Sequence, residues 1–400
     1  MRYHFSGIAG AGMNPLARLM RARGHSVQGS DRSFDQGKNA QVAAGLAALG
    51  IVIKPQDGSA VTANLDRFVY STAVEAETPE VRAARALGLE RVPRPALLAE
   101  VVAAGRPGVA IAGTSGKSTI TGMVGWLTRE TGLAATVLGG AALAGDGTSG
   151  CFLPGPVNGP VAAEACESDG TLTGYHPALG LIHNISRDHG EVDALLPQFE
   201  AFAKRSGRLL VNSASAEAAL LGRAVGARSY GAGPDADTPL EITSTGPHRA
   251  RGILHLQTGP VVLDVPQPGL HNLENAAAAA LIALDLGIAP ATVAALLARF
   301  LRPELRDLMP RLLRPADRLC YAEIFYAGGT VAKDISSRML ADDLPTALGC
   351  TYAPNHPAVI DWIRAEARPG DTVLIMGARD PELPGLARAA FNASQTRPAA

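Results

Sequence analysis

The stretch Gly113-Thr114-Ser115-Gly116-Lys117-Ser118-Thr119 follows the apolar run Val109-Ala110-Ile111-Ala112 and leads into an apolar run with helical spacing. A glycine-rich turn between a strand and a helix points backbone N–H groups and the positive end of the helix dipole at one place, where an anion binds well. Lys117 would then reach the β- and γ-phosphates of a nucleotide, and the hydroxyl of Ser118 or Thr119 would bind Mg²⁺. We therefore predict a nucleotide-phosphate site from Gly113 to Thr119.

The match is to a shorter variant of the phosphate-loop motif, because the strict pattern has a glycine where this chain has Ile111. The alternative interpretation is a surface turn with one exposed lysine. Gly-Lys-Ser-Thr at a strand-to-helix junction favours the phosphate site.

The composition indicates a globular protein of two or three domains. The chain has 400 residues, of which 47% are hydrophobic and 18% are charged, and this length exceeds what one hydrophobic core usually holds. The formal net charge is −1. Because no run of Lys and Arg is long enough to bind a phosphate backbone, we expect no nucleic-acid partner.

Cysteine usage and hydropathy predict a cytoplasmic protein without membrane insertion. The four cysteines stand far apart, with no Cys-x-x-Cys pair, which argues against a disulfide framework and against a zinc cage. The N-terminus lacks the apolar core of a signal peptide. The most apolar stretch, residues 276–284, ends at Asp285 and is too short to cross a bilayer.

The order of the patterns predicts an α/β fold. Strand-like apolar runs alternate with Ala- and Leu-rich helical patterns through about the first 300 residues, which is typical of βαβ units and parallel sheets. Pro93, Pro95 and the run Gly105-Arg106-Pro107-Gly108 interrupt the chain just before the phosphate loop. We therefore place a domain boundary near residue 106.

A second glycine-rich turn lies near the N-terminus. Gly7-Ile8-Ala9-Gly10-Ala11-Gly12-Met13 follows a predicted strand, and Asn14 is expected to cap the next helix, with Pro15 as its first residue. Asp31 ends a second strand about 20 residues beyond the glycines, as in a dinucleotide site. The spacing is Gly-x-x-Gly-x-Gly, however, so this turn alone fits NAD weakly. A tight turn whose glycines only permit close packing is equally compatible.

Polar side chains follow three further predicted strands, at the edge where an open parallel sheet binds ligands. Ser71 and Thr72 follow the first of these strands, Glu164 ends the second, and His189 comes after the third. Carboxylate and imidazole groups beside a phosphate loop are suited to hold the metal ions that ATP chemistry requires.

Other residues near these strand ends allow simpler interpretations. Glu167 and Asp169 are compatible with solvated loop acids, and His183 or His189 with hydrogen-bonded structural histidines. Lys204, on a helix-like segment, is by default a surface lysine.

Taken together, the motifs carry a family likeness. The chain resembles the Mur ligases of peptidoglycan synthesis, most closely the branch that adds L-alanine to UDP-N-acetylmuramic acid and the related branch that recycles muropeptides. Four ordered stretches carry the resemblance: Gly7 to Met13 with Gly29-Ser30-Asp31, Gly113 to Thr119, Glu164-Ala165-Cys166-Glu167-Ser168-Asp169, and Gly269-Leu270-His271-Asn272-Leu273-Glu274-Asn275-Ala276-Ala277.

The resemblance implies a role for each matching residue. The UDP-sugar would be bound by Gly10, Gly12, Met13, Asp31, Ser71 and Thr72. ATP would be held by Gly113, Thr114, Ser115, Gly116, Lys117, Ser118 and Thr119, with His271, Asn272 and Asn275 on the adenine and ribose. Mg²⁺ would be bound by Ser118, Glu164 and His189. The catalytic residues would be Lys117, Glu164 and His189. Lys204 lies where several relatives carry a carbamylated lysine, although the alanine-adding branch generally does not depend on one.

The resemblance also implies an architecture and a reaction. It implies a Rossmann-like UDP-sugar domain in residues 1–105, a central ATP-binding domain in 106–298 and a shortened Rossmann-like amino-acid domain in 299–400. The implied reaction is ATP-dependent amide synthesis. The sugar-linked carboxylate attacks the γ-phosphate to give an acyl phosphate, and the amine of an amino acid then displaces phosphate.

The C-terminal part departs from the family pattern. After residues 294–300, relatives continue with an Arg-containing hinge, an Asp-Asp-Tyr-Ala-His-type loop and a Gln-Pro-His-Arg-type strand end, and this chain has none of them. We therefore predict that an internal segment is missing. Residues 323–329 and 373–378 resemble the later strands of the domain, and Tyr326 and Asp334 are candidate contacts of the amino acid.

Three alternatives remain open. A non-catalytic protein that retains the UDP-sugar and ATP sites fits the missing segment, and nucleotide binding without hydrolysis would support it. A Mur-type ligase, recycling or other, that acts on a different substrate would carry the same motifs. An NAD-dependent dehydrogenase rests on the first glycine-rich turn alone.

Overall fold

The computed structural model describes most of the chain. The described residues are 1–71, 74–75, 77–140, 151–167, 170–186, 192–233, 235–246, 249–300, 313–314, 316–323, 337–342, 344, 349–368, 370–376 and 382–395. The chain divides into two compact units, Met1–Leu301 and Arg302–Ala400, and each is described by itself.

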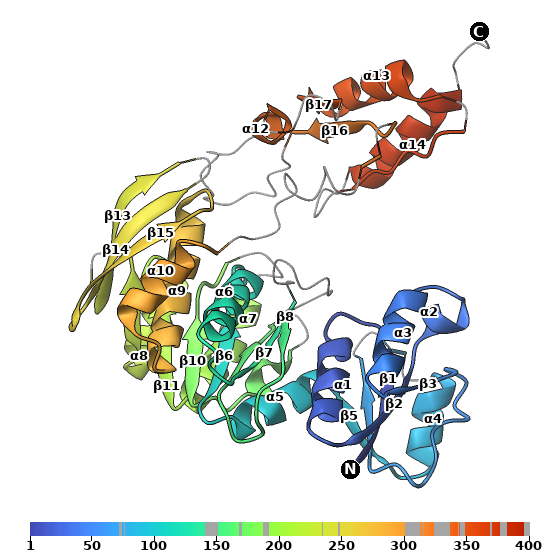
Figure 1. Ribbon diagram of the computed structural model, residues 1–400, viewed down its shortest axis with the longest axis horizontal. Helices are drawn as coiled ribbons and strands as arrows, with labels where there is room; N and C mark the ends of the chain where they lie inside the picture. The colour runs from blue at the N-terminus through green and yellow to red at the C-terminus, as the bar shows by residue number, and fades with distance from the viewer. Residues whose placement is uncertain are drawn as a thin grey trace. The chain divides into compact units, whose positions relative to one another are not determined.

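The first unit begins with a parallel sheet (Figure 1, blue). Its strands are β1 (Arg2–Ser6), β2 (Ser26–Ser30), β3 (Val52–Lys54), β4 (Arg67–Tyr70) and β5 (Glu90–Pro93). The accompanying helices are α1 (Met13–Ala22), α2 (Arg32–Asp35), α3 (Ala40–Ala48), α4 (Pro79–Ala86) and α5 (Arg94–Ala104). Within the described residues the strand order is β3-β2-β1-β4-β5. The order reverses between β1 and β4, and such a switch point creates a crevice at the carboxyl ends of the strands.

The local sequence explains this first layer. Helix α1 buries Met13, Leu16, Ala17 and Met20, which share one helical face at i, i+3, i+4 and i+7. The expected cap of this helix is wrong, because Gly12 is the N-cap and Asn14 lies buried within the first turn. The helix can begin earlier than expected because the backbone N–H groups of Met13 and Asn14 already donate to the Gly10 carbonyl.

A larger mixed sheet follows in the same unit (Figure 1, cyan to yellow). Its strands are β6 (Gly108–Ala112), β7 (Thr136–Gly139), β8 (Cys151–Leu153), β9 (Val161–Glu164), β10 (Leu179–Ile182), β11 (Arg208–Asn212), β12 (Arg228–Gly231), β13 (Thr238–Thr245), β14 (Ala250–Leu256) and β15 (Gly259–Val265). The order among the described residues is β15-β14-β13-β12-β11-β10-β6-β9-β7-β8. Strand β6 is buried at every residue and pairs in parallel with β9 and β10, as expected for an interior parallel strand.

Helices complete the core around this sheet. They are α6 (Lys117–Glu130), the short 3₁₀ helix η1 (Thr171–Gly174), α7 (Val192–Arg205), α8 (Ala216–Val225), α9 (Leu270–Asp285) and α10 (Pro290–Leu297). The alanines 276–280 of α9 are fully buried, in one hydrophobic cluster with residues of α6, β6 and β15. Among the described helices, none combines the length and apolarity needed to cross a bilayer.

Helix α5 connects the two sheets through a shared core. Leu97, Leu98 and Val101 of this helix belong to one buried cluster with Phe5 of β1 and Ile182 of β10. Because the cluster is continuous, the two sheets of the first unit pack as one body, which fits the division of the chain at residue 301.

The described part of the second unit is small. It contains β16 (Leu319–Ala322), β17 (Cys350–Ala353), α12 (Ser337–Asp342), α13 (His356–Glu366) and α14 (Leu383–Gln395), and β16 pairs with β17 in parallel. Residues 371–376 form no strand, so the strand expected at 373–378 is wrong over its described part. Of the strand expected at 323–329, all but Glu323 lies outside the described residues, as do Tyr326 and Asp334.

The prediction of an α/β fold with parallel sheets is confirmed. The domain bounds at residues 105 and 298 stay predictions.

Candidate functional site

The glycine-rich loop lies between β6 and α6, at the carboxyl edge of the larger sheet. Gly116, the N-cap of α6, has φ +83°, a conformation that L-residues with side chains rarely adopt. A Cβ atom there would lie 2.5 Å from Asn275 Oδ1 and 2.9 Å from His183 Cδ2. The loop backbone therefore packs directly against side chains that follow β10 and lie on α9.

Lys117 is held inside the loop by an ion pair. Its Nζ lies 3.0 Å from Glu167 Oε2 and also donates to the Gly113 carbonyl, and the Lys117 side chain is 11% exposed and that of Glu167 fully buried. The interpretation of Glu167 as a solvated acid is therefore wrong. Glu167 follows β9, and β9 pairs with the strand that carries the loop, so the ammonium group stands at the anion-binding end of α6.

Glu164 and Ser118 form a second cluster beside Lys117. Ser118 Oγ donates to Glu164 Oε2 at 3.1 Å, and the Gly140 N–H donates to Oε1 at 2.7 Å. Burial raises the pKa of the Glu164 carboxyl, and the hydrogen bonds together with the positive charges of Lys117 and Arg94 oppose this only in part. A cation at this carboxylate would favour its ionised form.

His183 is a buried neutral histidine behind the loop. Its Nδ1 lies 2.7 Å from the Tyr230 hydroxyl, and burial, with a contribution from the charge of His271, lowers its pKa to about 4. At neutral pH the ring therefore carries no charge. The geometry agrees with the structural interpretation of this histidine.

Asn184 anchors the loop, a role that sequence reasoning missed. Its Oδ1 accepts hydrogen bonds from the Thr114 hydroxyl at 2.9 Å and from the Ser115 N–H at 2.8 Å. The Ser186 N–H donates to the Thr114 hydroxyl at 3.1 Å. The only sequence signal was the position of Asn184 just beyond a predicted strand, next to the strand of the loop.

The residues at the start of α9 face the same loop. The Asn272 amide donates to the Pro268 carbonyl at 2.8 Å. Asn275 Oδ1 is buried and has no hydrogen-bond partner among the described residues. His271 is exposed and lies near enough to lower the pKa of His183. An acceptor with no partner, facing a phosphate loop, is suited to a donor on a ligand.

The first glycine-rich turn lies at the switch point of the smaller sheet. The N–H groups of Gly7 and Ile8 donate to the Ser30 carbonyl, and the Ala9 N–H donates to Asp31 Oδ2 at 3.0 Å. Met13 is buried at the start of α1, and Ser71 Cβ lies 3.5 Å from the place of a Cβ on Gly7. Gly10, Gly12, Asp31 and Ser71 thus gather at the carboxyl ends of β1, β2 and β4.

A buried carboxylate supports this turn. The Glu80 side chain of α4 is fully buried, lies 2.9 Å from His4 Nε2, and accepts hydrogen bonds from the hydroxyls of Ser30 at 2.6 Å and of Ser6. Ser6 and Ser30 end the two strands that flank the turn. Burial alone raises the pKa of Glu80, but these hydrogen bonds outweigh it and lower the pKa.

Two predicted site residues and one earlier candidate lie outside the described residues: Thr72, His189 and Asp169. In the part of the chain that the structure describes, no group of three His, Cys, Asp or Glu side chains is arranged to hold a metal ion. Lys204 is 68% exposed and lies 3.7 Å from Glu200 on the same helix.

Comparison with known proteins finds a relative along nearly the whole chain. UDP-N-acetylmuramate–L-alanine ligase from Kineococcus radiotolerans is 31% identical to this chain over 450 positions, which cover 95% of this chain and 93% of that protein. The chain belongs to the Mur ligase family. The model of the Mur ligase family, catalytic domain, matches residues 2–106. The family prediction from the motifs is confirmed.

Other relatives match a part of their length. The Mur ligase chain is 36% identical to UDP-N-acetylmuramate–L-alanine ligase of Arthrobacter sp. over 320 positions, which cover 75% of the chain but 64% of that relative. The alignment with the Kineococcus protein is longer than the whole 400-residue chain. It therefore contains positions that this chain lacks, which supports the prediction of a missing internal segment.

Solved structures support the fold. A murein peptide ligase from Psychrobacter arcticus matches all of this Mur ligase chain with a TM-score of 0.68 at 20% identity. A UDP-N-acetylmuramate-alanine ligase from Thermotoga maritima covers 99% of the chain with a TM-score of 0.64 at 21% identity.

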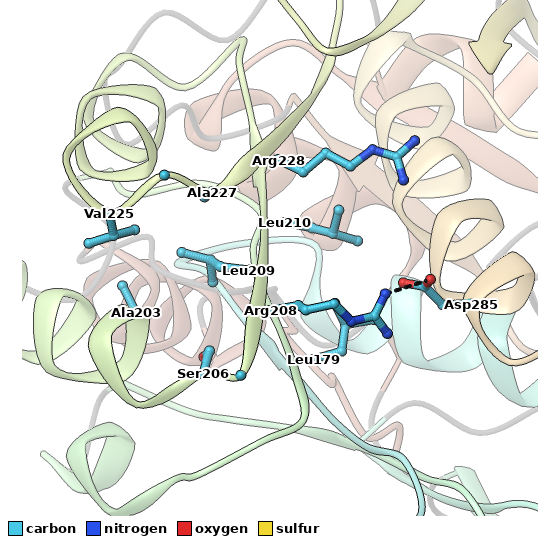
Figure 2. A pocket seen from close by; sticks show the side chains of 12 residues that line it. Leu179, Ala203, Ser206, Arg208, Leu209, Leu210, Val225, Ala227, Arg228 and Asp285 are labelled. Carbon is cyan, nitrogen blue, oxygen red and sulfur yellow. Dashed lines mark hydrogen bonds and ion pairs between the residues drawn. The ribbon is translucent and has the colours of Figure 1, made fainter. Parts of the chain in front are cut away.

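One cavity of the Mur ligase chain lies away from the loop. It measures about 270 Å³ and lies at the amino ends of β10, β11 and β12, where α7, α8 and α9 end (Figure 2). Figure 2 shows its two arginines, of which Arg208 pairs with Asp285 at 3.0 Å while Arg228 donates to the Thr238 hydroxyl at 2.8 Å. Helix C-termini favour cations, so these arginines have a structural explanation.

Proposed function

We propose that the chain is an ATP-dependent ligase that joins L-alanine to the carboxylate of UDP-N-acetylmuramic acid in the cytoplasm, as a step of peptidoglycan synthesis. The names of the relatives support the reaction. The observation that carries the proposal is the convergence of Lys117, Glu167, Ser118 and Glu164 around one phosphate loop. These residues come from α6 and from the end of β9, next to the strand of the loop.

ATP would bind along the loop from Gly113 to Thr119. Lys117 already stands at the N-terminus of α6, where its charge and the helix dipole both favour phosphate oxygens. Glu167 holds the lysine there before a nucleotide arrives. Asn275 Oδ1, which has no hydrogen-bond partner in the described part of the chain, is suited to accept a hydrogen bond from the adenine amino group, with His271 and Asn272 beside it.

Ser118 and Glu164 fit a magnesium site. Oxygens at adjacent corners of a Mg²⁺ octahedron lie about 2.9 Å apart, given Mg–O distances of about 2.0–2.1 Å, and Ser118 Oγ lies 3.1 Å from Glu164 Oε2. When bound, Mg²⁺ would neutralise negative charge on the phosphoryl group in transfer. We propose His189 as a further ligand.

The UDP-sugar would bind at the first glycine-rich turn. Gly10, Gly12 and Met13 bring the N-terminus of α1 to the diphosphate, while Asp31, Ser71 and Thr72 complete the site. The muramic carboxylate then attacks the γ-phosphorus of ATP, and ADP leaves with the electron pair of the broken P–O bond. The alanine amine attacks the acyl phosphate, loses a proton, and expels inorganic phosphate. Lys117 stabilises the negative charge on the phosphoryl group in transfer, and the positioning of the bound reactants supplies most of the remaining rate acceleration.

We propose three domains with bounds 1–105, 106–298 and 299–400, the last of which binds the amino acid.

A second candidate function is a UDP-sugar and ATP binding protein without turnover. It is favoured by the alignment positions that this chain lacks.

The test is phosphate release from ATP and Mg²⁺ with UDP-N-acetylmuramic acid, with and without L-alanine. Release that requires both substrates supports the ligase. The Lys117→Ala variant should abolish it, and Lys204→Ala, which removes an exposed lysine, should leave it unchanged. Tight ATP binding without release would contradict the ligase and support the binding protein. A panel of other UDP-sugars and amino acids tests for a different substrate.

A further inference from the structure

Arg94 is a cation beside the first glycine-rich turn that no motif identified. It is the first residue of α5, directly after β5, whose last residue Pro93 pairs with Tyr70 at the end of β4. The Arg94 side chain therefore starts from the same carboxyl edge of the sheet as Ser71 and the first glycine-rich turn.

The guanidinium of Arg94 lies against that turn. A Cβ atom on Gly12 would lie 3.0 Å from Arg94 Cδ, 3.1 Å from Nη1 and 3.3 Å from Nε. Gly12 is the N-cap of α1. The charged end of a half-buried arginine thus stands beside the backbone that the proposed function assigns to the diphosphate.

We infer that Arg94 binds the diphosphate of the UDP-sugar, an inference that rests on the proposed function. An arginine offers planar N–H donors that match phosphate oxygens in a bidentate manner, which a lysine does not. The neighbouring Gly12 has no side chain, so the guanidinium can lie against the loop backbone.

The test measures binding of two ligands by calorimetry, UDP-N-acetylmuramic acid and UDP-N-acetylglucosamine, which carries the diphosphate but no carboxylate. Arg94→Gln should lower the affinity for both ligands by about tenfold to a hundredfold, which is the usual contribution of a charge-assisted hydrogen bond. Arg94→Lys should retain only a part of the affinity that the Gln variant loses. The matched control is Arg91→Gln, which removes an exposed arginine of β5 three positions earlier and should bind both ligands normally.

Kinetics separate binding from a structural role. For Arg94→Gln the KM for UDP-N-acetylmuramic acid should rise while the KM for ATP stays near that of the parent. Weakening of UDP-N-acetylmuramic acid alone would overturn the inference, because the arginine would then bind the carboxylate. A lower thermal midpoint with unchanged affinity for both ligands would also overturn it. If the parent protein bound neither ligand, the proposed function would fail together with the inference.

Discussion

Replacing Gly116 with alanine tests whether the buried neighbours of the phosphate loop leave room for a side chain at this position. The new Cβ would meet Asn275 Oδ1 at 2.5 Å and His183 Cδ2 at 2.9 Å, and both side chains are buried. The left-handed conformation, φ +83°, costs a residue with a side chain about 1–2 kcal/mol, and overpacking adds about 1–3 kcal/mol. We expect the free energy of unfolding to fall by about 2–5 kcal/mol in total.

Gly132, just beyond the C-terminal end of the same helix, provides the control. Its φ is +68°, and apart from its two chain neighbours no described residue has an atom within 4 Å of a Cβ placed there, so Gly132→Ala should lose only the conformational part, about 1–2 kcal/mol. The assay is urea unfolding followed by the fluorescence of Trp126, in a background where Trp362, the second of the two tryptophans, is phenylalanine. If Gly116→Ala is no less stable than Gly132→Ala, the neighbours of Gly116 do leave room for a side chain and the reasoning is refuted.

Three further predictions concern the titratable side chains of Glu164, His183 and Glu80. Glu164→Gln should lower Mg²⁺-dependent phosphate release by about a hundredfold or more, and an unchanged kcat would contradict the magnesium assignment. Because the folded pKa of His183 is about 4 against an ordinary 6.5, this group should cost up to about 3 kcal/mol of stability as the pH falls from 6.5 to 4, and His183→Gln should flatten that slope in urea titrations. Glu80→Gln should lower the free energy of unfolding by about 2–4 kcal/mol. Since the pKa of Glu80 is lowered on folding, its stabilisation is present above the ordinary value of 4.5 and is lost as the pH falls further, so the Gln variant should lose less stability below pH 4.5 than the parent.

The sequence predicted those parts of the site that consist of residues close together in the chain. The loop from Gly113 to Thr119 and the strand ends at Glu164 and Asp31 depend on local patterns of glycine, apolar and polar residues, which translate directly into strand, turn and helix. Ion pairs between residues far apart in the chain leave no such local pattern. Glu167 looked solvated because its burial depends on Lys117, fifty positions away.

Residues without a local signature escaped prediction. His4 and Glu80 lie 76 positions apart and meet only because β1 and α4 fold together. Arg94 stands between Pro93 and Pro95, which the sequence marked only as an interruption of the chain. Residues 373–376, the described part of the strand expected at 373–378, form no strand for a related reason, because an apolar run forms a strand only where a neighbour can satisfy its backbone hydrogen bonds.

Mass spectrometry of the sugar nucleotide after incubation with ATP, Mg²⁺ and L-alanine tests the central claim most directly. The account predicts that UDP-N-acetylmuramic acid gains the mass of one alanyl residue, that ADP forms in equal amount, and that the Lys117→Ala variant produces neither. Unchanged UDP-N-acetylmuramic acid, under conditions where the protein binds both ATP and the sugar nucleotide, would contradict it.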